Sequence, residues 1–192
     1  MDRGTTIFWS IVALLFAASA FFAVQGGRLK RSIQRAGVTV STGDLVTLAS
    51  VTDGDSVIVR TAAGDDVVVR IIGIKSLEAG AGKESLGVYG VEAKHALDRA
   101  CANKAIRVLL GNPPKDKHGR SLATLYVEDE DVALRLVKDG SVLVYTAFPF
   151  PDMQRYLDEQ AGAKAQRKGL WADPAAVARA DLLLGMWRRE AP

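Results

Sequence analysis

Five short apolar stretches between residues 44 and 127 have the pattern of β-strands. They are rich in Val, Ile, Leu and Thr, which favour strands, and turn-forming residues close each of them. The turns are Asp53-Gly54-Asp55, Ala63-Gly64-Asp65 and Asn112-Pro113-Pro114. In chain order the stretches are DLVTLASV, DSVIVRT, DDVVVRIIGI, AIRVLL and SLATLYV. The pattern therefore predicts five strands, the third of which runs through RIIGI.

A helical spacing of apolar residues predicts three helices in the same part of the chain. They cover residues 91–102, residues 132–139, which end at Gly140, and residues 152–168, which end at Gly169. A glycine directly after the last periodic residue is typical of a helix C-terminus. Five short strands with a helix between the third and the fourth indicate a small β-barrel with helices, of OB type in the α+β class.

The closing segment, residues 173–192, is predicted to be an amphipathic helix. Asp173 is placed as an N-cap, and Pro174 occupies the first helical position, where its missing N–H costs nothing. The apolar residues that share one face are Val177, Leu184 and Trp187. We expect this face to dock on the domain; the alternative is contact of Trp187, Arg188 and Arg189 with a membrane surface.

The N-terminal part of the chain has the composition of a membrane anchor. After a tail at residues 1–6, residues 7–25 carry no charged side chain and are just long enough to cross a bilayer as one helix. Residues 26–37 form a basic linker, and this positive flank predicts that the following domain lies on the cytoplasmic side. The alternative is a cleaved signal peptide, which would leave the domain secreted or periplasmic.

The composition indicates a folded protein but does not decide its function. Of the 192 residues, 48% are hydrophobic and 24% are charged, so the chain is expected to fold, with one domain at residues 38–172. The net charge of +3 is compatible with nucleic acid or an anionic membrane as partner. Cys101 is the only cysteine, which excludes an internal disulfide, and its place on the apolar face of a predicted helix indicates a buried structural thiol.

Four charged motifs each have an ordinary structural explanation. They are Asp53-Gly54-Asp55, Arg70, Glu78 and the segment DKHGR at residues 116–120. Asp-Gly-Asp is a common turn, and a charged segment between two strands is typical of an exposed hairpin.

Taken together and in order, these motifs resemble the staphylococcal-nuclease-like (thermonuclease) family. The resemblance covers residues 43–172 and is carried by VTDGDSVIVR, VRIIGIKSLE, YGVEAKHAL, DKHGRSLATLYV, LVKDGSVLVY and AQRKGLW. It implies a five-stranded OB barrel with three helices, nucleic acid or a nucleotide as partner, phosphodiester hydrolysis as activity and Ca²⁺ as cofactor.

The resemblance also implies roles for individual residues. Arg70 and Arg120 match phosphate-clamping arginines, a role for which the planar guanidinium is suited. Glu78 matches the glutamate that serves as general base or orients water. Asp55 matches a calcium ligand, and Ser76 stands where a backbone carbonyl binds the metal.

Further positions surround this set. Asp53 matches an acid close to the metal, and Lys117 matches a lysine near the nucleotide phosphate. Phosphate or nucleotide contacts are also expected from His118, Phe148 and Lys75. Lys75 occupies the position of the second metal-binding aspartate.

Lys75 leaves three hypotheses open. An ammonium in place of a carboxylate removes a ligand and repels a dication, so the calcium site is expected to be impaired. The first hypothesis is a membrane-anchored nuclease with a weakened metal site. The second is a catalytically silent module that binds nucleic acid, a nucleotide or a protein near the membrane. The third is a scaffold that contacts only proteins.

Overall fold

The computed structural model describes residues 9, 12, 39–77 and 86–190. The chain divides into two compact units, Met1–Val38 and Thr39–Pro192. The predicted membrane helix and the basic linker lie outside the described residues except at Trp9 and Val12. Among the helices that the structure describes, none has the length and the apolar composition needed to cross a membrane.

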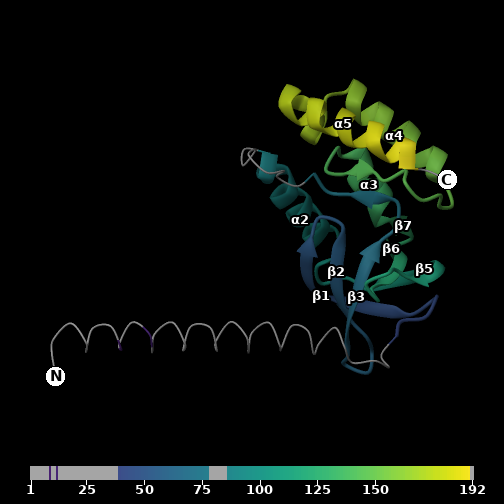
Figure 1. Ribbon diagram of the computed structural model, residues 1–192. Helices are drawn as coiled ribbons and strands as arrows, with labels where there is room; N and C mark the ends of the chain where they lie inside the picture. The colour runs from purple at the N-terminus through teal and green to yellow at the C-terminus, as the bar shows by residue number, and fades with distance from the viewer. Residues whose placement is uncertain (1–8, 10–11, 13–38, 78–85, 191–192) are drawn as a thin grey trace. The chain divides into compact units, whose positions relative to one another are not determined.

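A closed five-stranded barrel forms the centre of the second unit, as the sequence predicts (Figure 1). Its strands are β1 Leu45–Asp53, β2 Ser56–Arg60, β3 Asp66–Ile71, β5 Ile106–Lys115 and β6 Ser121–Val127. Antiparallel pairing gives the order β3-β2-β1-β5-β6, and a parallel pairing of β3 with β6 closes the circle. Closure removes the open sheet edges that would otherwise expose unpaired backbone groups.

Alternation of buried and less buried residues is clearest in β6 among the barrel strands. Along β6 every second side chain is buried, beginning with Ser121 and ending with Val127. Successive side chains of a strand point to opposite faces, so the buried set fills the barrel interior. Val57, Val59 and Leu125 are among the residues with no solvent exposure. Each such side chain contributes about 1.5–3 kcal/mol relative to an exposed position.

Two strand predictions are wrong in their extent. The third predicted strand ends at Ile71, because Gly73 adopts a φ of 80° and the ring of Phe150 fills the space where a Cβ would lie. A separate short strand, β4 Ile74–Lys75, follows and pairs with β8 Leu143–Val144. The fourth strand, in contrast, continues through Asn112-Pro113-Pro114 to Lys115 with a register irregularity, where the sequence predicts a turn.

The helices gather around one end and one side of the barrel (Figure 1). They are α2 Gly87–Cys101, α3 Val132–Lys138, α4 Met153–Ala165 and α5 Pro174–Glu190, with a 3₁₀ turn η2 at Gly169–Ala172. α2 begins four residues before the predicted start at 91. The short strand β7, Glu130–Asp131, leads into α3, whose first turn is capped by the Asp131 carboxylate, which accepts a hydrogen bond from Leu134 N.

A second apolar cluster joins the last helices to β8 and to the segments that follow β4 and precede α2. Its buried members are Leu77, Leu86, Leu143, Ala147, Ala163, Leu170, Trp171, Ala176, Ala180 and Trp187.

Cys101 is fully buried in α2, and burial raises the pKa of its thiol to about 12, so the expectation of a structural thiol is confirmed.

Candidate active site

Asp55 occupies the centre of the candidate site, in the tight turn between β1 and β2. The Asp53 carboxylate accepts a hydrogen bond from Asp55 N at 3.0 Å, which shapes the turn. Gly54 leaves room for close packing, because a Cβ there would lie 2.5 Å from Cβ of Ala93 and 2.7 Å from Cβ of Ser76. The turn is therefore pressed against α2 and the segment after β4, and Asp55 is only 1% exposed.

Both oxygens of the Asp55 carboxylate already have partners. Oδ1 accepts a hydrogen bond from Ser56 Oγ at 3.1 Å and lies 3.1 Å from Arg70 Nη1. Oδ2 lies 3.1 Å from Lys75 Nζ and accepts a hydrogen bond from Ser76 N at 3.2 Å. A buried carboxylate is stable when it is paired and hydrogen-bonded in this way.

Arg70 is buried and directs its guanidinium to the backbone. Nη1 donates to the carbonyl oxygens of Asp55 at 2.8 Å and Ile71 at 2.9 Å, and Nη2 donates to the carbonyl of Ile74 at 2.7 Å. Burial lowers the pKa of Arg70, while the charge of Asp55 acts in the opposite direction. The side chain therefore ties the Asp55 turn, β3 and β4 together.

Arg120 lies beside Arg70 but in a more open environment. The parallel pairing of Val69 with Ser121 places the end of the Asp116–Arg120 turn next to β3, and the charge of Arg120 contributes to the lowered pKa of Arg70. Arg120 Nε donates to Asp116 Oδ2 at 2.7 Å, and its side chain is 32% exposed. The fold therefore brings together the two arginines that the resemblance selects.

Asp116 holds the turn that carries Arg120. Its Oδ1 accepts hydrogen bonds from the backbone N–H groups of His118 at 2.8 Å and Arg120 at 3.0 Å. Sequence reasoning assigns no role to Asp116, although an aspartate that precedes a Gly-Arg pair by three residues is a signal for such a turn. Lys117 and His118 are exposed at its tip.

The two acids of the Asp53-Gly54-Asp55 turn differ in how readily they ionise. Burial raises the pKa of Asp53, and the neighbouring Asp55 raises it further. For Asp55 burial has the same effect, but the charges of Arg70 and Lys75 and a hydrogen bond with Asp53 outweigh it, so the pKa lies below its ordinary value. Asp55 is therefore the stronger acid of the two, and its carboxylate lies between the side chains of Arg70 and Lys75.

The remaining predicted residues lie at different distances from this centre. Ser76 is buried, and its N–H contacts Asp55. Phe148 is 69% exposed and lies close to Tyr145, whose N–H donates to the carbonyl of Gly73 at 2.9 Å. Glu78 lies outside the described residues.

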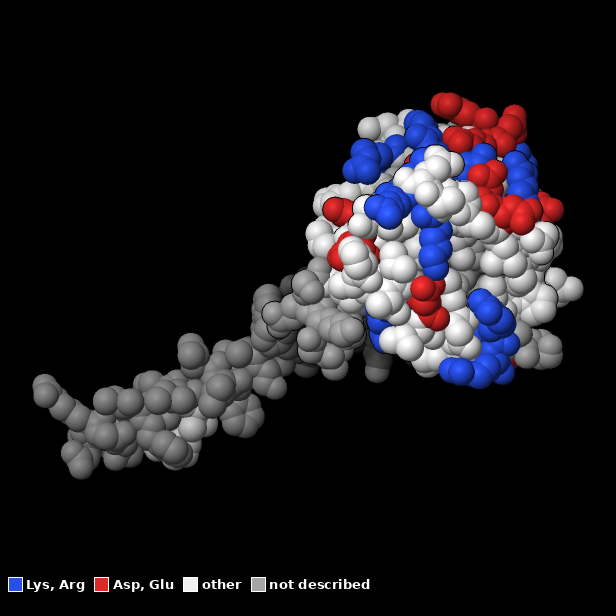
Figure 2. Space-filling view, turned by 90° about the horizontal axis from the view of Figure 1, so that it is seen from above, with Lys and Arg blue, Asp and Glu red and all other residues white. Residues whose placement is uncertain are grey.

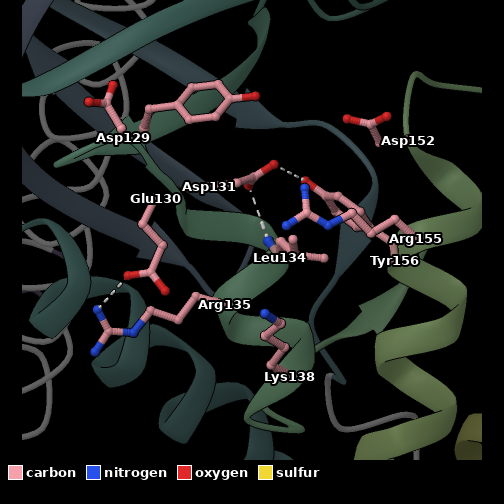
Figure 3. A pocket seen from close by; sticks show the side chains of 10 residues that line it. Asp129, Glu130, Asp131, Leu134, Arg135, Lys138, Asp152, Arg155 and Tyr156 are labelled. Atoms are coloured by element: carbon pink, nitrogen blue, oxygen red, sulfur yellow. Dashed lines mark hydrogen bonds and ion pairs between the residues drawn. The ribbon is translucent and has the colours of Figure 1, made fainter.

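A polar pocket lies elsewhere, between the β6–β7 turn, α3 and α4 (Figure 3). It has a volume of about 140 Å³. Its acids are largely engaged in the fold: Asp131 accepts from Tyr156 Oη at 2.7 Å, and Glu130 pairs with Arg135. None of the site residues predicted from the sequence lines this pocket.

Comparison with known proteins decides the family. A family model described as staphylococcal nuclease homologue matches residues 68–173. The chain belongs to the staphylococcal nuclease family. The match includes Arg70, Lys75 and Arg120 and ends one residue before α5 begins.

Several curated proteins share the nuclease fold region with this chain. A thermonuclease of Staphylococcus intermedius is 33% identical over 128 residues, which is 67% of this chain and 75% of that protein. A thermonuclease of Staphylococcus hyicus is 27% identical over 176 residues, 90% of this chain and all of that protein. A protein of Haemophilus influenzae described as an uncharacterized endonuclease is 27% identical over 143 residues, 74% of this chain and 72% of that protein. The staphylococcal nuclease domain described here is thus homologous to thermonucleases and to an endonuclease.

Proposed function

We propose that this staphylococcal nuclease domain binds the phosphates of nucleic acid or a nucleotide and that its calcium-dependent hydrolysis is impaired. The observation that carries the proposal is the ion pair between Lys75 Nζ and Asp55 Oδ2 at 3.1 Å. An ammonium on this carboxylate supplies positive charge to an anionic ligand. It cannot polarise and orient an attacking water as a metal ion does.

The residues around Asp55 do not fit a calcium ion. Calcium takes six to eight oxygen ligands, usually with several carboxylates among them. Within residues 39–77 and 86–190, no group of three His, Cys, Asp or Glu side chains gathers as ligands. A dication about 5 Å from one unit of positive charge is opposed by about 7 kcal/mol at an effective dielectric constant near 20. Lys75 and Arg70, each 3.1 Å from the Asp55 carboxylate, would oppose it in this way.

The exposed basic side chains favour a phosphate ligand. Lys75 and Arg120 have side chains that are about one third exposed, at 35% and 32%, and Lys117 is exposed beside Arg120. Acidic and basic side chains are both present on the face seen in Figure 2, so the electrostatic potential of that face is not uniformly positive. Binding of phosphate is therefore expected from the side chains of Arg120, Lys117 and Lys75.

An active phosphodiester hydrolase is the alternative function. The relatives described as thermonucleases and as an endonuclease support it, together with the presence of Arg70 and Arg120 side by side. Under this alternative the cluster would lower the barrier to hydrolysis by holding the phosphate oxygens.

Two assays on the full-length chain in mild detergent, one of oligonucleotide binding and one of cleavage, distinguish these functions. We expect binding of single-stranded DNA or RNA at low salt and no calcium-stimulated cleavage. Arg120→Ala should weaken binding about tenfold, the value of one charge-assisted hydrogen bond. Arg60→Ala is the matched control, because Arg60 also pairs with an aspartate, at 2.8 Å, but lies at the far end of β2.

Two results would contradict this proposal. Calcium-stimulated cleavage that EDTA abolishes, and that Arg120→Ala also abolishes, would establish the hydrolase. Absence of any oligonucleotide binding at low salt would exclude both functions for this site.

We also propose that residues 7–25 anchor the domain to a membrane with the domain on the cytoplasmic side. The uncharged composition of this stretch and the basic residues after it support the proposal. Protease added to intact cells should then spare the domain and digest it only after the membrane is permeabilised. Digestion in intact cells would place the domain outside.

A further inference from the structure

The last helix, α5, has an apolar stripe on the face that points away from the domain. Its packed face includes Ala176 and Ala180, which are fully buried, and Trp187, which is 8% exposed. On the opposite side four exposed apolar residues follow one another at a spacing of three or four, which aligns their side chains along the helix. This outer stripe consists of Ala175, Ala178, Leu182 and Met186. A surface helix ordinarily presents charged and polar side chains on the side opposite its packed face, so the outer stripe is unusual.

The two large members of the outer stripe are well exposed. Leu182 is 61% exposed and Met186, one helical turn later, is 45% exposed. α4 and α5 form the outermost layer at one end of the domain (Figure 1). Trp187, for which the sequence leaves contact with a membrane open, is instead buried on the packed face. Contact of α5 with a membrane therefore has to use the outer stripe.

The charged residues beside the outer stripe favour an anionic partner. Asp181 is paired with Lys164 of α4, whose Nζ lies 2.7 Å from Asp181 Oδ1. Arg188 and Arg189 are both exposed just after the stripe, and the exposed Glu190 follows them, so two positive charges face one negative charge at this end. An apolar stripe with arginines at its end is typical of helices that lie in the interface of an anionic bilayer.

The outer stripe is too small to hold a second protein by itself. α5 has 17 residues and is therefore about 25 Å long, and a stripe about 10 Å wide along it has an area of about 250 Å². A stable protein–protein interface buries about 800 Å² of each partner. A bilayer requires less, because a domain that is already tethered to it meets the surface at a high effective concentration.

We propose that the outer stripe of α5 lies on the surface of an anionic bilayer, with Leu182 and Met186 inserted at the level of the headgroups and Arg188 and Arg189 against the lipid phosphates. The inference rests on the proposed membrane anchor at residues 7–25. Residues 26–38 can span at most about 45 Å, so the tether keeps the domain within reach of the surface. The contact gives the domain one orientation on the membrane in place of free rotation about its tether.

Fluorescence quenching by a labelled lipid tests the inference on the full-length chain. The chain is reconstituted into vesicles of phosphatidylcholine and phosphatidylglycerol that contain a nitroxide-labelled lipid, and a fluorophore is attached at Met186→Cys. Cys101 does not compete for the fluorophore, because its thiol is buried and has a pKa raised to about 12. Leu109→Cys is the matched control, because Leu109 is 41% exposed but lies on β5 of the barrel. We expect quenching several-fold stronger at position 186 than at position 109.

Three further substitutions, each combined with the label at position 186, distinguish the apolar from the charged part of the contact. Leu182→Asp should abolish the quenching, whereas Val91→Asp, on α2 at a side chain that is 54% exposed, should leave it unchanged. Arg188→Gln should weaken the contact about fivefold on the anionic vesicles and leave it unchanged on phosphatidylcholine alone. A thermal midpoint measured for each variant reports any loss of folding.

The outcomes distinguish the inference from the anchor on which it rests. If the chain does not float with the vesicles, the proposed anchor is wrong and the inference fails with it. If the chain floats but the labels at positions 186 and 109 are quenched equally, the anchor stands and the inference is wrong. Self-quenching of the label at position 186 in detergent without lipid would assign the outer stripe to a second copy of this chain and would also contradict the inference.

Discussion

Lys75→Asp is expected to bind calcium more tightly than the wild-type chain does. The change removes the ammonium that lies 3.1 Å from Asp55 Oδ2 and puts a second carboxylate in its place. Two carboxylates supply the hard oxygen ligands that calcium requires. Arg70 remains on the other oxygen of Asp55, held there by three backbone carbonyls, so binding should be weak, with a Kd of about 1 mM. Isothermal titration calorimetry with CaCl₂ measures this difference.

Lys75→Asn is the control for that substitution. It removes the positive charge that repels calcium but adds no carboxylate. It therefore distinguishes the effect of removing this repulsion from the effect of adding a calcium ligand. We expect it to bind calcium far more weakly than Lys75→Asp, because a neutral amide attracts a dication less than a carboxylate does. Equal calcium affinity in the wild type and Lys75→Asp would show that Lys75 does not obstruct the site and would remove the main support for impaired hydrolysis.

The barrel could be predicted because its strands are rich in Val, Ile, Leu and Thr and most of them end at distinctive turn residues. The exceptions have local physical causes that a hydrophobicity pattern does not contain. RIIGIK is apolar enough to be one strand, but the left-handed backbone of Gly73 under the Phe150 ring divides it into β3 and β4. Asn112-Pro113-Pro114 has turn composition, yet β5 passes through it with an irregular register.

The motifs predict which residues form the candidate site, but they do not predict how buried each side chain is or which atoms it contacts. Sequence places Arg70 and Arg120 in one site as similar arginines, whereas the structure buries the first among carbonyls and leaves the second a third exposed. The contact of Lys75 with Asp55 depends on how separate segments pack, which no local spacing encodes. The ring contact of Tyr145 with Trp187 of α5 likewise joins two distant segments.

Arg70→Met is expected to destabilise the domain strongly, because Arg70 holds the site together. The substitution keeps the apolar length of the side chain but removes the charge beside buried Asp55 and the donors to three carbonyl oxygens. Breaking a buried ion pair by removing one partner costs about 3–5 kcal/mol. For a domain of this size the loss should lower Tm by roughly 10 °C, as measured by circular dichroism or calorimetry.

Arg120→Met is the matched comparison for this prediction. The same substitution at the partly exposed arginine breaks only its contact with Asp116, and an exposed pair is worth about 1 kcal/mol or less. Its main effect should therefore fall on oligonucleotide affinity. Adding Asp55→Asn to Arg70→Met should recover part of the lost stability, because the buried carboxylate no longer needs a counter-charge. Equal losses of stability at the two arginines would contradict this division of roles, in which Arg70 supports the fold and Arg120 meets the ligand.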